Sequence, residues 1–158
     1  MGLLRWLEST AYADWILTSA RGWPFMLSMH AIGLAIIVGI VFSCNLRLLG
    51  LYSSIPYTSL RRLLSIAWIG FCINLVTGLS IFTTQATSYI VSPPFILKIT
   101  FIALGSWNLY YTQKILQRDA ASWEAAGAVP QIGTTLGISS LVFWTMSVIT
   151  GRLIAYLA

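Results

Sequence analysis

The chain has 158 residues, of which 58% are hydrophobic and only 8% are charged, and its mean hydropathy is +0.83. A soluble domain carries about 25% charged residues, so this composition excludes a soluble globular protein and predicts an integral membrane protein. The formal net charge is +5, but the basic residues lie at the ends of apolar runs and form no single patch. We therefore expect the lipid bilayer as partner and exclude nucleic-acid binding.

The first segment, residues 3–19, is apolar but interrupted by Arg5, Glu8 and Asp14. A cleavable signal peptide has an uninterrupted apolar core, which this segment lacks. Its two tryptophans suit the headgroup region of a bilayer. We therefore predict a short amphipathic helix that lies on the membrane surface.

Four apolar runs follow, each near the length of about 20 residues that a helix needs to cross a bilayer. We predict an all-α integral membrane protein, a four-helix bundle in one domain covering 1–158. The spans are expected at about 24–46, 63–83, 95–116 and 134–156.

The basic residues predict the orientation of these spans. Cytoplasmic loops carry an excess of lysine and arginine, and here the first and third loops are the basic ones. The second loop has no charge, and the arginines near the N-terminus are offset by two acidic residues. We expect a bacterial inner-membrane protein with both termini in the periplasm. The residues beside the first and third loops are Arg47, Arg61, Arg62, Lys114 and Arg118.

The first span contains His30, the only histidine of the chain. It lies six residues after Pro24, which is roughly 9 Å along a helix. An ionisable residue inside a span indicates a functional site. The predicted topology brings Lys98 and Arg152 to the same outer half of the membrane. A histidine below two cations suits haem b, with imidazole as the iron ligand and the cations beside the propionates.

Three further residues are candidates for contact with such a cofactor. Gly33 shares a helix face with His30 and leaves room for a macrocycle, Asn74 lies near mid-membrane, and Trp144 is expected to touch the ring. Each has a structural alternative, since small and polar residues also mediate contacts between membrane helices. Lys98 and Arg152 have one too, because long basic side chains snorkel to the interface.

Two other functions remain open at this point. Met26, Met29 and His30 supply thioether and imidazole groups, which suit Cu(I), although Met29 is rotated away from the face that the other two share. A copper-handling membrane protein is therefore an alternative. The other is a structural subunit of a larger membrane complex, without a cofactor.

The chain resembles a family of bacterial inner-membrane proteins with four spans and no assigned activity. The resemblance covers all four spans. It rests on MHAIGLAIIVGIVFSCNLRLLGL, RRLLSIAWIGFCINLVTGL, PPFILKITFIALGSWN and FWTMSVITGRLIAYL.

More distantly, the layout is similar to HemJ-type protoporphyrinogen oxidases and CopD-like membrane domains. In that group a histidine in the first span and a lysine in the third accompany haem b, and His30 and Lys98 match these positions. Arg47 and the Thr77-Gly78-Leu79 motif match as well. The resemblance implies haem binding. The tryptophan midway along the first span, the histidine after it and the polar motif before the last span are absent, so oxidation of a porphyrinogen is not implied.

These observations together predict a b-type haem protein that transfers electrons with a quinone or a periplasmic partner, alone, as a homo-oligomer or as a subunit of a larger complex. With one histidine, the sixth iron position is open, or is taken by Lys98, by a methionine such as Met26 or Met146, or by a second subunit. The spans contain no paired carboxylates. If the protein is an enzyme, we expect a membrane oxidoreductase.

Overall fold

The computed structural model describes residues 2–157, and every regular element in that range is a helix. The prediction of an all-α fold is therefore confirmed. The helices are α1 (Gly2–Glu8), α2 (Ala11–Thr18), α3 (Gly22–Leu48), α4 (Tyr57–Thr84), α5 (Ala86–Tyr89), α6 (Pro93–Ala126) and α7 (Gln131–Leu157).

Three of these helices, α3, α4 and α7, are long and apolar enough to cross a membrane. This agrees with the membrane protein that composition predicts. The longest helix, α6, has 34 residues but falls outside that class. Its sequence between Lys98 and Lys114 includes Asn108 and Gln113 together with several tryptophan and tyrosine residues, which lower its hydropathy.

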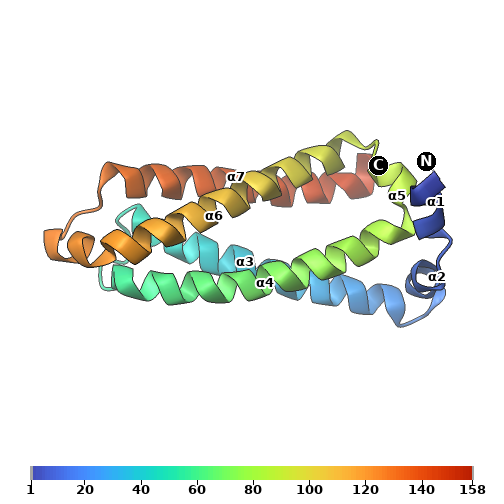
Figure 1. The fold of residues 1–158 in the computed structure, drawn as a ribbon, viewed down its shortest axis with the longest axis horizontal. Coiled ribbons are helices and arrows are strands. Elements are labelled where there is room, and N and C mark those ends of the chain that lie inside the picture. Colours follow the sequence, from blue (N-terminus) through green and yellow to red (C-terminus); the bar gives the residue numbers. More distant parts are fainter. Residues whose placement is uncertain (1, 158) are drawn as a thin grey trace.

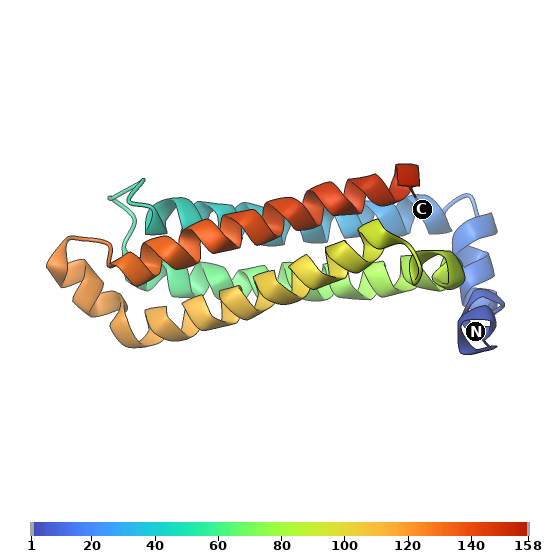
Figure 2. The same ribbon diagram turned by 90° about the horizontal axis from the view of Figure 1, so that it is seen from above.

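The four long helices lie side by side and alternate in direction (Figure 1). α3 packs most extensively on α4, and α6 on α7, so that two helical hairpins face each other. Both ends of the described chain lie at one end of the molecule, together with α1, α2 and α5 (Figures 1 and 2). We call this the terminal end, and we call the other end, with the α3–α4 and α6–α7 connections, the loop end.

The helices extend beyond most of the predicted boundaries. α4 begins directly after Pro56, and Pro93 occupies the first position of α6, where a missing N–H costs nothing. The helix that contains the third predicted span continues past residue 116. No glycine or proline interrupts the alanine-rich stretch that follows, and its residues favour helix. α6 ends only at Gly127, whose φ of +63° gives a left-handed cap.

The prediction of one helix over 3–19 is wrong, because the structure has two short helices there. Thr10 caps α2 by accepting a hydrogen bond from the Ala13 amide (3.3 Å), and such side-chain bonds compete with helix continuation. Both helices run across the terminal end of the long helices (Figure 2). Glu8 attaches α1 to α5, since one of its oxygens accepts bonds from the amide and hydroxyl of Thr87, both 2.8 Å.

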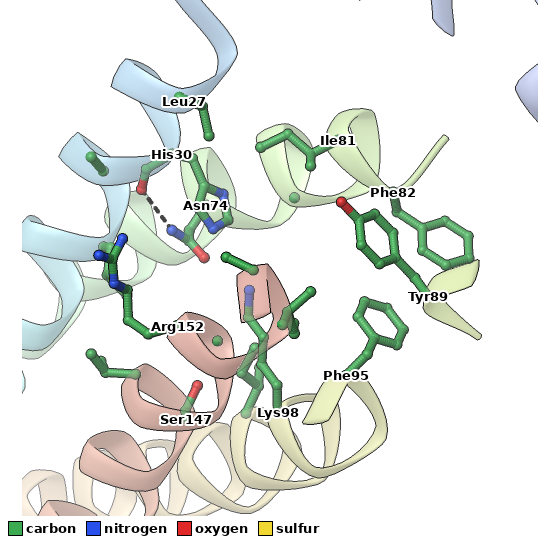
Figure 3. Close-up of a pocket in the computed structure, with 18 of the residues that line it drawn as sticks. Leu27, His30, Asn74, Ile81, Phe82, Tyr89, Phe95, Lys98, Ser147 and Arg152 are labelled. Atoms are coloured by element: carbon green, nitrogen blue, oxygen red, sulfur yellow. Dashed lines mark hydrogen bonds between the residues drawn. The ribbon is translucent and has the colours of Figure 1, made fainter. Parts of the chain in front are cut away.

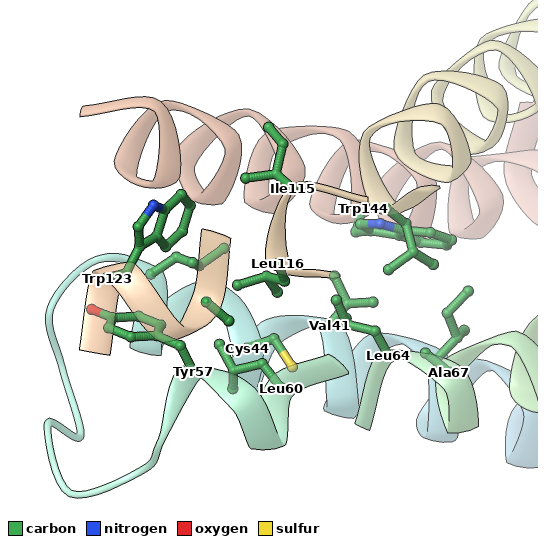
Figure 4. Close-up of a cluster of buried hydrophobic side chains, with 14 residues drawn as sticks. Val41, Cys44, Tyr57, Leu60, Leu64, Ala67, Ile115, Leu116, Trp123 and Trp144 are labelled. Carbon is green, nitrogen blue, oxygen red and sulfur yellow. The ribbon is translucent and has the colours of Figure 1, made fainter. Parts of the chain in front are cut away.

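The buried hydrophobic side chains gather toward the loop end (Figure 4). Leu60 and Leu64 of α4 and Leu116 of α6 are almost completely buried, and Tyr57 meets Trp123 edge-on, with ring centroids 5.8 Å apart. Polar contacts between helices are satisfied here as well. The Asn45 side-chain amide donates to Ser140 Oγ (2.9 Å), and that of Asn108 donates to Ser139 Oγ (2.8 Å).

Arg47 closes the loop end of this core. It is buried, and its Nε donates to the Ile55 carbonyl (2.6 Å) while one terminal nitrogen donates to the Tyr57 hydroxyl (2.9 Å). The guanidinium carbon lies 3.9 Å from the centroid of the Tyr57 ring, a cation–π contact. Glu124 accepts a bond from the Tyr57 amide (2.7 Å). The start of α4 is thus fixed to both α3 and α6.

Candidate functional site

The terminal half of the molecule contains a cavity of about 500 Å³ between the long helices (Figure 3). Sites for small molecules and cofactors enclose about 300–1,000 Å³ and are mostly apolar with a few polar groups. This cavity matches both properties. Side chains from α3, α4, α5, α6 and α7 line it, and most of them are apolar.

His30 enters the cavity from α3 and is held from α4. Its Nδ1 lies 3.0 Å from Thr77 Oγ1, and its backbone carbonyl accepts a hydrogen bond from the Asn74 side-chain amide (2.8 Å). The Thr77 hydroxyl also lies 2.7 Å from the Ile73 carbonyl. A hydroxyl has one proton to donate, and a carbonyl can only accept it. The Thr77 oxygen is therefore free to accept a hydrogen bond from His30 Nδ1–H.

This network selects the tautomer of the imidazole. When Nδ1 carries the proton, Nε2 of a neutral histidine carries the lone pair. Within residues 2–157, Nε2 has no hydrogen-bond partner. Ligating histidines in metal sites have the same arrangement, with one ring nitrogen bonded to a neighbouring oxygen and the other free for the metal. The His30 ring therefore has a fixed orientation, with Nε2 left without a partner among the described residues of the cavity.

Gly78 provides the space that the imidazole occupies. A Cβ added to Gly78 would lie 3.2 Å from His30 Cε1, so a larger residue would displace the ring. Residue Gly78 is also part of the cavity wall. The sequence suggests Gly78 as a residue for close helix packing and as part of the Thr77-Gly78-Leu79 motif, but its spacing alone does not show that it faces His30.

Lys98 and Arg152 line the same cavity as His30. Lys98 is half-buried and points from α6 toward the His30 ring (Figure 3), whereas Arg152 is exposed at the edge on α7. Gly151 lies beside the lysine, since a Cβ there would be in van der Waals contact with Lys98 Cε at 3.4 Å. No aspartate or glutamate is among the described residues that line the cavity. The charged groups that face it are therefore cationic.

Asn74 and Trp144 also line the cavity. Asn74 bonds to the His30 backbone, so it joins two helices, as the structural alternative anticipated, and it positions the ligand helix at the same time. Trp144 is buried, and a Cβ on Gly105 would lie 3.0 Å from its ring. The indole therefore packs on α6 and separates the cavity from the filled core of the loop end.

Gly33 does not line the cavity. A Cβ on this residue would lie 2.8 Å from the Asn74 backbone nitrogen and 3.0 Å from the Gly70 carbonyl oxygen. Gly33 thus lets the backbones of α3 and α4 approach closely, which is the helix-packing alternative. The expected contact with a macrocycle has no support at this position.

The residues of the copper alternative do not converge on the cavity. Met26 is buried and Met29 is half-buried, and neither lines it. Across residues 2–157, no group of three histidine, cysteine, aspartate or glutamate side chains is arranged to hold a metal ion. Of the three expected copper ligands, only His30 faces the space.

Three aromatic residues that sequence reasoning did not identify form one wall of the cavity. Phe82, Tyr89 and Phe95 come from α4, α5 and α6, and their rings are nearly parallel, with centroids 5.4 Å apart for Phe82–Phe95 and 5.7 Å for Tyr89–Phe95. Burial raises the pKa of the Tyr89 hydroxyl. No spacing pattern identifies this cluster, since it forms only when three chain segments meet.

The site thus combines an imidazole with a free nitrogen, two cations, a flat aromatic wall and a mostly apolar volume. Such a site suits a large, mostly apolar molecule that carries negatively charged groups and a metal to which a nitrogen atom can bind. No family model, curated protein or solved structure matches the chain.

Proposed function

We propose that the chain is a four-span membrane protein of the bacterial inner membrane that binds one b-type haem through His30 and transfers electrons. The single observation that carries the haem assignment is the chemistry of the cavity. An imidazole with a free Nε2 faces an apolar space whose charged groups, Lys98 and Arg152, are both cations.

The four-span arrangement is supported by the course of α6. Its first residue follows α5 at the terminal end, and its last residues lead into α7 at the loop end. Its neighbours α4 and α7 have the length and hydropathy of spanning helices. A helix that runs beside them from end to end crosses the same thickness, although its own hydropathy is lower. Buried polar residues on α6 face neighbouring helices, as Asn108 does, which avoids contact with lipid.

The orientation is supported by the basic residues of the loop end, Arg61, Arg62 and Arg118 among them, which favour the cytoplasmic side. Both ends of the chain are then periplasmic, and the cavity lies in the outer half of the membrane. α1 and α2 run across the terminal end, where two short apolar helices suit the interface with the headgroups.

Haem supplies one-electron chemistry at iron when it is bound. The residues of this chain have separable roles toward it. His30 offers Nε2 to the metal, and Thr77 holds the imidazole through Nδ1. Lys98 and Arg152 offer charge-assisted hydrogen bonds to the two propionates. Gly78 leaves space beside the imidazole, and the apolar wall excludes water.

The partner that exchanges electrons is, in this proposal, a membrane quinone or a periplasmic redox protein. The position of the cavity in the outer half of the membrane supports both. The distant resemblance to HemJ-type and CopD-like domains supports haem binding by the same histidine and lysine positions. A homo-oligomer or a larger complex would supply a second axial ligand, which the single histidine of one chain does not.

The test is an absorption spectrum of the protein purified from haem-replete cells, oxidised and then reduced with dithionite. We expect a Soret band that shifts on reduction, is lost in His30→Ala, and is retained in the control Met29→Ala. Because an alanine variant can fail for lack of stability, His30→Gly with added imidazole is the second variant, and imidazole should restore the band. A colourless wild type that also fails to bind added haemin contradicts the proposal. Stoichiometric copper in that protein, lost in Met29→Ala, would favour the copper alternative.

A further inference from the structure

A second concave surface lies at the loop end, on the opposite side of the filled core from the His30 cavity. It is a groove of about 290 Å³ between the first turns of α4 and the second half of α6. Thr58, Arg61 and Arg62 line it from α4, and Gln117 and Arg118 line it from α6. We call it the arginine groove.

The charges in this groove are not balanced. Arg118 is paired with its neighbour Asp119, through two contacts of 2.8 Å. Glu124, the other acidic residue of this end, accepts the Tyr57 amide. Within the described chain, Arg61 and Arg62 have no carboxylate partner. The groove therefore offers two unpaired guanidinium groups and a third that is engaged at its rim.

The remaining lining residues suit an anion with several oxygen atoms. Leu116, Ala120 and Ala121 complete the lining of the groove, and the two alanines have short side chains that leave space for a ligand. Thr58 supplies a hydroxyl and Gln117 an amide as additional donors. A guanidinium presents a planar fork of donors that matches two oxygens of a phosphate group. Donors from two helices border one volume, an arrangement that suits a phosphate group with its several oxygen atoms.

The depth of the groove identifies the source of that phosphate. Arg61 and Arg62 belong to the first turns of α4, a helix with the length and hydropathy of a membrane span. The end of such a helix lies at the level of the lipid headgroups, where basic pockets between spanning helices bind anionic lipids. We propose that the arginine groove binds the phosphodiester headgroup of an anionic glycerophospholipid. The inference does not depend on the haem site, with which the groove shares no residue.

The experiment is native mass spectrometry of the full-length protein in detergent, titrated separately with phosphatidylglycerol and phosphatidylcholine. We expect phosphatidylglycerol to bind in preference to phosphatidylcholine. A basic residue near an anionic headgroup contributes about 1 kcal/mol, so Arg61→Gln and Arg62→Gln should each weaken binding about fivefold. The control is Lys114→Gln, which removes one charge at the same end outside the groove and should leave binding unchanged.

A conservative double variant distinguishes a loss of binding from a loss of folding. Arg61→Lys/Arg62→Lys keeps both charges but removes both forks, and we expect binding weaker than in the wild type but stronger than in Arg61→Gln/Arg62→Gln. Equal binding of the two lipids, or wild-type affinity in the double glutamine variant, overturns the proposal. A third arm adds inorganic phosphate at millimolar concentration. If it binds in the absence of lipid and displaces phosphatidylglycerol, the groove is a site for soluble phosphate and the lipid assignment is wrong.

Discussion

The two halves of this helical protein are built from the same four long helices and yet differ in what lies between them. At the loop end, large side chains such as Leu60, Leu64 and Leu116 fill the interior. At the terminal end, the same helices enclose a cavity of about 500 Å³. The hydropathy of α3, α4 and α7 does not distinguish the halves, since these three apolar helices contribute to both. The fit between the side chains that face inward does, because they pack together at the loop end and surround a space at the terminal end.

Small residues contribute to the open space of the terminal half. Gly78, Ser147 and Gly151 line the cavity together with larger apolar residues. Trp144 belongs to both regions, because it is a member of the buried core and a lining residue of the cavity. Contacts between side chains in a filled region stabilise the fold. A region with a cavity has fewer such contacts, but its oriented polar groups can bind a ligand. The comparison predicts that the loop end contributes most of the packing stability, and that the terminal end holds the proposed site.

The largest expected effect tests this division directly. Leu64→Ala should lower the free energy of unfolding by about 2–5 kcal/mol, the usual cost of an alanine in a filled core. Leu34→Ala, on the wall of the cavity, should cost less than about 1 kcal/mol, because a side chain beside an existing space loses fewer contacts. Unfolding in detergent with increasing dodecyl sulfate measures both. Equal costs would show that the two halves do not differ in packing.

A smaller effect is expected where the terminal half holds its imidazole. Thr77→Val removes the oxygen next to His30 Nδ1 but keeps the shape of the side chain. Loss of such a supporting bond lowers affinity for a metal about 10-fold or more, so haem should dissociate faster and saturate at higher concentration. Thr84→Val is the matched control, since Thr84 is buried on the same helix and bonds only to the Ile81 carbonyl. If both variants bind haem equally, Thr77 does not position the imidazole.

The smallest effect concerns two carboxylates, one at each end of the molecule, that accept a hydrogen bond from a backbone amide. Glu8 accepts a hydrogen bond from the Thr87 amide at the terminal end, and Glu124 accepts one from the Tyr57 amide at the loop end. The Thr87 amide and hydroxyl, together with Arg5, hold the pKa of Glu8 below its ordinary value of 4.5. A lowered pKa means that this bond stabilises the fold above pH 4.5 and is lost as the pH falls through the lowered value.

Hydrogen exchange of the Thr87 amide measures this attachment of α1. In the wild type its protection, corrected for the intrinsic rate at each pH, should decrease as the pH falls below 4.5. In Glu8→Gln the protection should be lower at neutral pH and independent of pH, because a neutral acceptor forms the weaker bond. Glu124→Gln should leave Thr87 unaffected. A protection that is the same in wild type and Glu8→Gln at all values of pH would show that the carboxylate does not hold α1.

Much of the candidate site was visible in the sequence. His30, Lys98, Arg152, Asn74 and Trp144 were selected from it, and all five line one cavity. Ionisable and polar residues are costly inside a bilayer, so their occurrence in apolar helices is informative even without a fold. Helix direction then predicts similar depth for His30, Lys98 and Arg152, because each helix rises by about 1.5 Å per residue.

The sequence by itself determined the helical class, the apolar segments and the positions of the polar residues along their helices, since these follow from composition and from the rise of a helix. Only the tertiary structure decided which way each helix is rotated. Because of these rotations, Gly33 lies against α4 and Gly78 lies beside the imidazole. They also bring together Phe82, Tyr89 and Phe95, which come from three helices. The physical reason is that hydropathy is nearly uniform around a membrane helix, whereas the fit of side chains between helices is specific to one rotation.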